Sequence, residues 1–209
     1  MPHIPPSKIG PSGRGNQSQS DAAAAADKTP TPPQDPSPSA ASGGAALPLC
    51  GDFDIRIARD GTWYYRDSPI GRKPLARLFS TVLRREADGS YWLVTPVERG
   101  RIIVDDVPFT AVELTAVGSG RGQTLTFRTN LDDEVTAGPV HPLRVAHDPE
   151  TGEPSPYIMV RNGLEARLAR PVYYQLVELG EERREGGASI YGVWSNGQFF
   201  PLGSLEDGS

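Results

Sequence analysis

The first 49 residues limit what this chain can fold into, because they cannot contribute to a core. This segment is rich in Pro, Ser, Gly and Ala, and after Met1 its large aliphatic side chains are limited to Ile4, Ile9, Leu47 and Leu49. Such a segment buries too little apolar surface to offset the chain entropy that folding removes. We therefore predict a disordered Pro/Ala/Ser-rich tail over 1–49 and expect every folded module to follow it.

Charge and cysteine content argue against several classes of partner. Basic and acidic residues balance within the tail, so the formal net charge of −5 belongs to the rest of the chain. An acidic domain without a basic stripe argues against nucleic-acid binding, which relies on phosphate neutralisation. With the single cysteine Cys50, neither an intrachain disulfide nor a thiolate metal cluster is expected. The sequence contains no apolar run of about 18 residues and no secretory signal, so we expect no membrane contact and a cytoplasmic protein.

After the tail, Gly and Pro divide the chain into short apolar runs. Alternating residues on either side of Asp60-Gly61 predict a hairpin with strands at 53–58 and 62–66. Pro96 and Gly100 interrupt the next apolar stretch, which predicts two strands joined by a bend within 91–104. Further strands are predicted at 109–118, 124–129, 143–148 and 157–161.

Two segments carry apolar residues at helical spacing. The first is predicted to form a helix over 73–87, with Pro74 suited to its first turn. The second is predicted over 171–184, after a short turn at 163–169. The aromatic residues near the end flank Asn196-Gly197, a strong hairpin signal, so segment 186–209 should dock on the core.

An internal echo links the two predicted helices. LARLFSTVL at 75–83 and LARPVYYQLV at 168–177 share Leu-Ala-Arg ahead of an apolar helix, and strands precede both. The match is too short to prove a duplication, but it suggests two similar halves at 50–113 and 114–185. Each half would hold strands and one helix, which is an α+β arrangement.

The pair Asp105 and Asp106 is the most prominent candidate for chemistry. Adjacent residues of a strand point to opposite faces, so the two carboxylates cannot act together as an acid and base unless a bulge intervenes. Pro108 follows the pair and favours a strand end. A solvated strand end, a ligand contact and catalysis all stay open for these residues.

Basic residues suggest two further anion sites, each with a simpler explanation. Arg99 and Arg101 would lie on one side of a strand and could grip a phosphate or carboxylate, although surface ion pairs are the common outcome. Arg72 and Lys73 precede the first predicted helix, whose free N–H groups favour anions, although the spacing is not that of a P-loop.

Motifs for metals, cofactors and catalysis are missing from the sequence. His141 and His147 do not have the spacing of a zinc site, and Cys50 has no adjacent base. There is no dinucleotide fingerprint and no G-x-S-x-G or H-E-x-x-H motif. We therefore expect no metal site, no cofactor and no catalytic residue.

Several of these segments, in this order and spacing, resemble the DUF1285 family of bacterial proteins of unknown function. They are SPIGRKPLARLFSTVL, YWLVTPVERGRIIVDDVPF, HPLRV, PYIMVRNGLEARLARPVYYQLVEL and GVWSNGQFFPL, and they cover about 50–202. The resemblance implies a duplicated α+β core of two small, mostly antiparallel modules with one main helix each, the second pleckstrin-homology-like. It also implies a ligand-binding or signalling group with a site, for a nucleotide-like molecule, between the modules.

Carrying the family motifs onto this chain gives the candidate ligand-binding residues. They are Arg72, Arg77, Glu98, Asp105, Asp106, Arg161, Glu165 and Arg170, with Phe109 or Tyr157 available to stack on a ligand. The leading hypothesis is a regulatory module, not an enzyme, that binds a small anionic ligand between its halves. The alternatives are a module that recruits a protein partner, and a hydrolase or transferase that uses the carboxylates.

Overall fold

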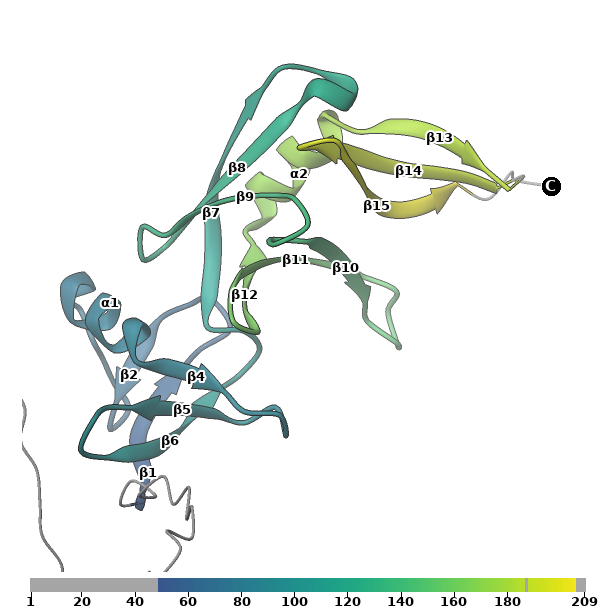
Figure 1. The fold of residues 1–209 in the computed structure, drawn as a ribbon. Coiled ribbons are helices and arrows are strands. Elements are labelled where there is room, and N and C mark those ends of the chain that lie inside the picture. Colours follow the sequence, from purple (N-terminus) through teal and green to yellow (C-terminus); the bar gives the residue numbers. More distant parts are fainter. Residues whose placement is uncertain (1–48, 187, 206–209) are drawn as a thin grey trace, which may run out of the picture. The chain divides into compact units, whose positions relative to one another are not determined.

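A mostly β protein with two helices is seen in the computed structural model, which describes residues 49–186 and 188–205 (Figure 1). The predicted tail over 1–49 therefore lies almost wholly outside the described residues. All of the described residues belong to one unit of the chain. Within that unit, no described helix is long and apolar enough to cross a membrane.

The first module is a six-stranded sheet with the strand order β3-β2-β1-β6-β5-β4. Its central pair, β1 and β6, is parallel, and the other neighbours are antiparallel. The elements are β1 (Leu49–Ile57), β2 (Trp63–Tyr65), β3 (Ser68–Pro69), α1 (Lys73–Thr81), β4 (Leu83–Arg85), β5 (Tyr91–Val94) and β6 (Arg99–Val104).

The second module is also a six-stranded sheet, with the order β10-β11-β12-β7-β8-β9. Here β12 and β7 form the parallel central pair. The elements are β7 (Phe109–Val117), the short 3-10 helix η1 (Gly120–Gly122), β8 (Thr124–Thr129), β9 (Glu134–Thr136), β10 (Leu143–His147), β11 (Pro154–Arg161), β12 (Leu164–Leu168) and α2 (Arg170–Glu178).

The two sheets share one topology. Adding six to each strand number of the first sheet gives the strand order of the second sheet, read from its other edge. The expected pair of similar modules is therefore confirmed. The helices occupy different places, however, since α1 lies between the third and fourth strands of its module and α2 follows the sixth. The Leu-Ala-Arg echo thus does not mark equivalent positions of a repeat.

A third sheet of three antiparallel strands ends the described chain. It contains β13 (Glu181–Glu185), β14 (Ala188–Ser195) and β15 (Gln198–Leu205). Asn196 and Gly197 both have positive φ, 51° and 76°, which is the conformation that a tight hairpin turn needs. Val193 and Phe200 are 0% and 2% exposed and belong to the common core, so β14 and β15 pack on the rest of the described molecule.

Both predicted helices are shorter in the structure than their spacing suggested. The first ends at Thr81, because Leu83 is fully buried and pairs with Leu93 in the next strand pair. The second ends at Glu178, and 181–185 form β13. The predicted turn at 163–169 is mainly strand β12, whose Ala166 pairs with Phe109. Short apolar runs fit a helix or a strand equally well, and here strand pairing decides.

The change from the first sheet to the second falls between Val104 and Phe109. The expected division at 113/114 lies inside β7, which pairs with β8 and β12 and so belongs wholly to the second sheet. Figure 1 shows the chain passing from β6 to β7 at this point.

A buried serine fixes the third sheet to the second module. The Ser195 hydroxyl is 0% exposed, donates to the carbonyl of Ala137 at 2.8 Å and accepts from the N–H of Leu125 at 3.0 Å. We expect Ser195→Ala to lower the free energy of unfolding by about 1–3 kcal/mol, because a buried donor and acceptor lose their partner. Urea unfolding would measure this, with the exposed Ser204→Ala as control. Equal stability of the two variants would contradict the role given to Ser195.

Candidate functional site

The turn after β1 fits against the start of the second module. The Asn130 amide donates to the carbonyl of Gly61 at 3.1 Å, and its oxygen accepts from the N–H of Thr110 at 3.1 Å. The hydroxyl of Thr110 donates to the carbonyl of Asp60, also at 3.1 Å. Gly61 has φ 84°, and a Cβ there would lie 2.6 Å from the Asn130 nitrogen. A glycine is therefore required both for the turn and for the close contact.

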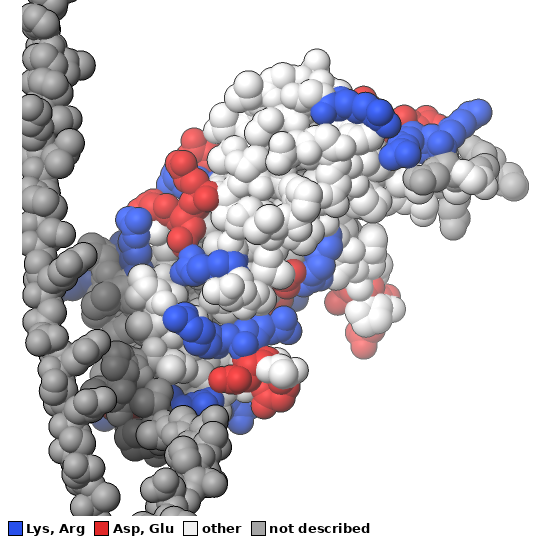
Figure 2. Space-filling model, in the orientation of Figure 1, with Lys and Arg blue, Asp and Glu red and all other residues white. Residues whose placement is uncertain are grey.

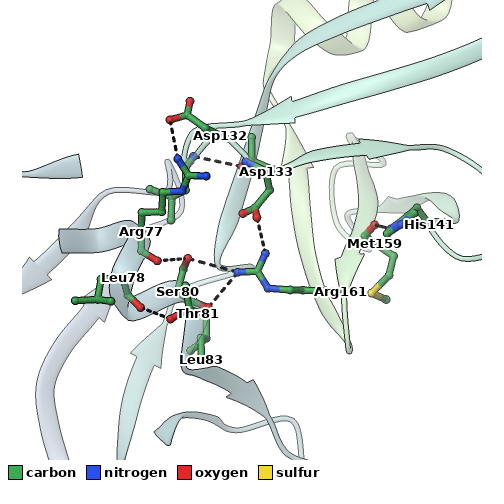
Figure 3. A network of polar contacts seen from close by, with 12 residues as sticks. Arg77, Leu78, Ser80, Thr81, Leu83, Asp132, Asp133, His141, Met159 and Arg161 are labelled. Atoms are coloured by element: carbon green, nitrogen blue, oxygen red, sulfur yellow. Dashed lines mark hydrogen bonds and ion pairs between the residues drawn. The ribbon is translucent and has the colours of Figure 1, made fainter. Parts of the chain in front are cut away.

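Arg161, at the end of β11, reaches across to helix α1 of the first module (Figure 3). Its guanidinium donates to the carbonyl of Ser80 at 3.1 Å and to the Asp133 carboxylate at 2.8 Å. It also lies 4.9 Å from the ring centre of Phe109. Ser80 is in the last turn of α1, where main-chain carbonyls lack helical partners and carry partial negative charge. Arg161 thus caps the helix of one module from a strand of the other.

A second set of contacts between the modules gathers at Asp132, beside the first. Its carboxylate accepts from Lys73 at 2.6 Å and from Arg128 at 3.3 Å, and Arg77 lies 3.9 Å away. Figure 3 shows Arg77 and Asp132 next to the Arg161 contacts. The Lys73 hydrogen bond is the largest cause that lowers the pKa of Asp132. These side chains are well exposed, so the pairs add less stability than Arg161 does.

The carboxylate of Asp106, between β6 and β7, interacts with three side chains. It accepts from the Tyr157 hydroxyl at 3.1 Å and from Arg167 at 3.1 Å, and Arg59 lies 3.8 Å away. Burial is the main cause that raises the pKa of Tyr157, and the charge of Asp106 adds to it. The phenol therefore stays protonated and able to donate at neutral pH.

Asp105 has a different partner from its neighbour. Both of its oxygens accept from Arg56 of β1, at 2.9 Å and 2.5 Å, and that guanidinium is half exposed. The two adjacent carboxylates thus belong to separate ion pairs, and they lie in the bend after β6 rather than within a strand. Their separation leaves no paired acid and base.

A groove of about 700 Å³, here called the junction groove, lies between the two modules. Arg59 and Asp60 line it from the turn after β1, and the remainder of its wall comes from the second module. Those residues are Thr110, Glu153, Pro154, Pro156, Arg167, Leu168, Ala169, Arg170, Tyr173 and Tyr174. The groove therefore combines guanidinium groups from both modules with prolines, aliphatic side chains and two tyrosines.

The arginines of the junction groove differ in exposure and in how firmly they are paired. Arg167 is held by Asp106 and by the Ser155 hydroxyl at 3.2 Å, and is 22% exposed. Arg59 and Arg170 are 69% and 74% exposed, with Arg170 making a 3.4 Å pair with the exposed Glu153. Arg170 is also the first residue of α2, whose Ala169 N-cap makes no side-chain cap hydrogen bond. Two largely exposed guanidinium groups thus lie in the groove at the positive end of a helix.

The ten predicted ligand residues do not converge on one site. Five of them, Arg77, Asp106, Phe109, Tyr157 and Arg161, lie at the contacts between modules, and Phe109 is fully buried beneath Arg161. Of the ten, Arg170 alone lines the junction groove. The other four lie elsewhere: Arg72 at the start of α1, Glu98 between β5 and β6, Asp105 paired with Arg56, and Glu165 paired with Arg144 at 2.6 Å.

Charge on the visible face is mixed. In Figure 2, basic and acidic side chains lie beside one another over the lower part of the described molecule, while a broad region above them is uncharged. Within the described residues, no group of three or more His, Cys, Asp and Glu side chains could hold a metal ion.

The paired sheets and the groove between them define a two-module, mostly β protein. Two family models match it: the "Domain of unknown function (DUF1285), N-terminal domain" over 46–107 and the "Protein of unknown function (DUF1285), C-terminal domain" over 108–202. The chain belongs to the DUF1285 family, which confirms the resemblance drawn from its motifs. The boundary between the matches coincides with the change of sheet.

Solved structures of the same family resemble this chain. A DUF1285 family protein from Silicibacter pomeroyi DSS-3 is 51% identical, with 77% of this chain and 85% of that chain covered and a TM-score of 0.71. One from Shewanella baltica OS155 is 25% identical, with 60% and 91% covered and a TM-score of 0.48. Among curated proteins, none matches the chain.

The neighbouring carboxylates offer a matched test of the junction. Asp106→Asn should lower the free energy of unfolding by about 1–3 kcal/mol, because Arg167 loses its charge partner and Asn keeps one acceptor oxygen for the two donors, Arg167 and Tyr157. Asp105→Asn should cost at most about 1 kcal/mol, since its ion pair with Arg56 is more exposed. Urea unfolding of both variants measures the difference, and a larger loss for Asp105→Asn would contradict this assignment.

Proposed function

We propose that the protein binds a small organic anion in the junction groove and acts as a regulatory module rather than as an enzyme. The observation that carries the proposal is the position of Arg59 and Arg170. They come from different modules, are largely exposed, and both line a groove whose other walls are mainly apolar.

The two arginines are suited to the charged end of such a ligand. A guanidinium presents a planar fork of donors that fits a carboxylate or phosphate. The N-terminus of α2 adds partial positive charge beside Arg170. Arg167 is already held by Asp106 and Ser155, so its part is to keep the wall of the groove in place.

The remaining walls favour a ligand with a flat or apolar body. Pro154, Pro156 and Leu168 offer apolar surface, and Tyr173 and Tyr174 offer aromatic rings. Burial raises the pKa of Tyr173, so its hydroxyl stays protonated. A nucleotide-like molecule, with a base, a sugar and a phosphate, combines these properties.

Two carboxylates, Asp60 and Glu153, also line the junction groove, and they would play different parts. The backbone N–H of Thr62 is the largest cause that lowers the pKa of Asp60, so this group stays ionised and can accept from a ligand hydroxyl or amine. The exposed pair of Glu153 with Arg170 contributes about 0–1 kcal/mol, so a ligand anion can take the place of Glu153.

A ligand held by Arg59 and Arg170 would connect the two modules. Its binding would favour the arrangement in which both arginines reach it, and this population shift is the regulatory step that we propose. The pleckstrin-homology likeness of the second module and the cytoplasmic location stay predictions.

Thermal unfolding of the full chain with AMP tests the proposal. At 100 times its Kd, a ligand that binds the folded state adds about 2.7 kcal/mol to the free energy of unfolding. We expect AMP to raise the melting temperature and adenosine, which lacks the phosphate, to raise it much less. Arg59→Gln and Arg170→Gln should each weaken AMP binding about tenfold or more.

The matched control is Arg184→Gln, an 85% exposed arginine of β13 outside the groove, which should leave the shift unchanged. The proposal is contradicted if neither AMP nor pyrophosphate raises the melting temperature. An AMP shift that survives in both Arg59→Gln and Arg170→Gln would contradict it as well.

A further inference from the structure

A second groove, of about 410 Å³, lies in the first module between α1 and the β2–β3 hairpin. We call it the α1 groove. Its apolar walls include Ile55, Tyr65, Ile70, Leu75 and Phe79. It shares no lining residue with the junction groove. Its volume is within the range of about 300–1,000 Å³ that is usual for small-molecule sites.

The α1 groove leaves apolar surface in contact with water. Tyr65 is 48% exposed and Leu75 is 38% exposed, so both keep area that an apolar ligand could bury. The wall is also fixed in place, because the Phe79 ring stacks on the buried Trp63 with centroids 6.2 Å apart. An apolar ligand would therefore enter without first ordering the groove.

One basic side chain, Arg72, lines the α1 groove beside this apolar surface. Within the described part of the chain its guanidinium makes no hydrogen bond or ion pair, whereas the nearby Lys73 is held by Asp132 and Arg66 by Asp54. Arg72 is also the N-cap residue of α1, and no side chain caps that helix end. The α1 groove thus combines apolar walls with one guanidinium, that of Arg72, that has no partner in the described part of the chain.

We propose that the α1 groove binds a medium-chain aliphatic carboxylate. The chain would lie against Leu75, Ile70 and Phe79, and the carboxylate would accept both hydrogen bonds of the Arg72 fork. A single guanidinium complements a single negative charge, which favours a carboxylate over a doubly charged phosphate. This site does not depend on the proposed function of the junction groove.

Calorimetric titration of the full chain with decanoate, below its micelle concentration, tests this proposal. We expect one bound decanoate per chain. Octanoate, which is two methylenes shorter, should bind about 16-fold more weakly, because each buried methylene strengthens binding by roughly fourfold. Uncharged decanol should bind about tenfold more weakly than decanoate, since it cannot use the charge of Arg72.

Variants separate the two parts of the site. Arg72→Gln should weaken decanoate binding by about tenfold and leave decanol binding unchanged. Leu75→Asn, at a partly exposed position, should weaken both ligands alike. Arg77→Gln, on the same helix but outside the groove, should change neither.

Three results would overturn the proposal. They are the absence of saturable decanoate binding, equal affinity for decanol and decanoate, and an equal loss in Arg72→Gln and Arg77→Gln. The two proposals can fail separately, because Arg72→Gln should leave the AMP shift of the junction groove unchanged.

Discussion

The hydrogen bond from Arg161 to the carbonyl of Ser80 is the contact on which the arrangement of the two modules most depends. It joins a side chain of the second sheet to the main chain at the end of α1, and it brings a positive charge to the negative end of that helix. Asp133 compensates the same guanidinium, and Phe109 packs beneath it. Removing Arg161 would leave the end of α1 and the partly buried Asp133 carboxylate without their cation. The other oxygen of Asp133 already lacks a hydrogen-bond partner among the described residues.

The junction groove follows from this arrangement. Two sheets of the same topology lie in one unit, and their contacts at Asn130, Asp106 and Arg161 hold the turn after β1 beside the start of α2. That proximity brings Arg59 and Arg170 to one groove although they are far apart in the sequence. The α1 groove arises within the first module alone, where a short helix leaves Leu75 and Tyr65 partly uncovered.

Local patterns predicted much of the fold and less of the site. Alternation and turn residues identified the strands around Asp60-Gly61 and the hairpin at Asn196-Gly197, because those signals act within a few residues. The end of α1 was misplaced because Leu83 fits a helix until its pairing with Leu93 is known.

The groove residues Arg59, Arg167 and Tyr174 carry no local signal, since what brings them together is the packing of two modules. Asp105 and Asp106 lie in the bend after β6, so the alternation of a strand gives neither their directions nor the identity of their partners. The most direct test of the account is hydrogen exchange in Arg161→Met, read by mass spectrometry across the chain. We expect the amides of α1 and β4 to exchange at least about tenfold faster, which corresponds to a loss of more than about 1.4 kcal/mol of local stability. Exchange in β7 and β8 should change little. Unaltered protection of α1 in Arg161→Met would contradict the account.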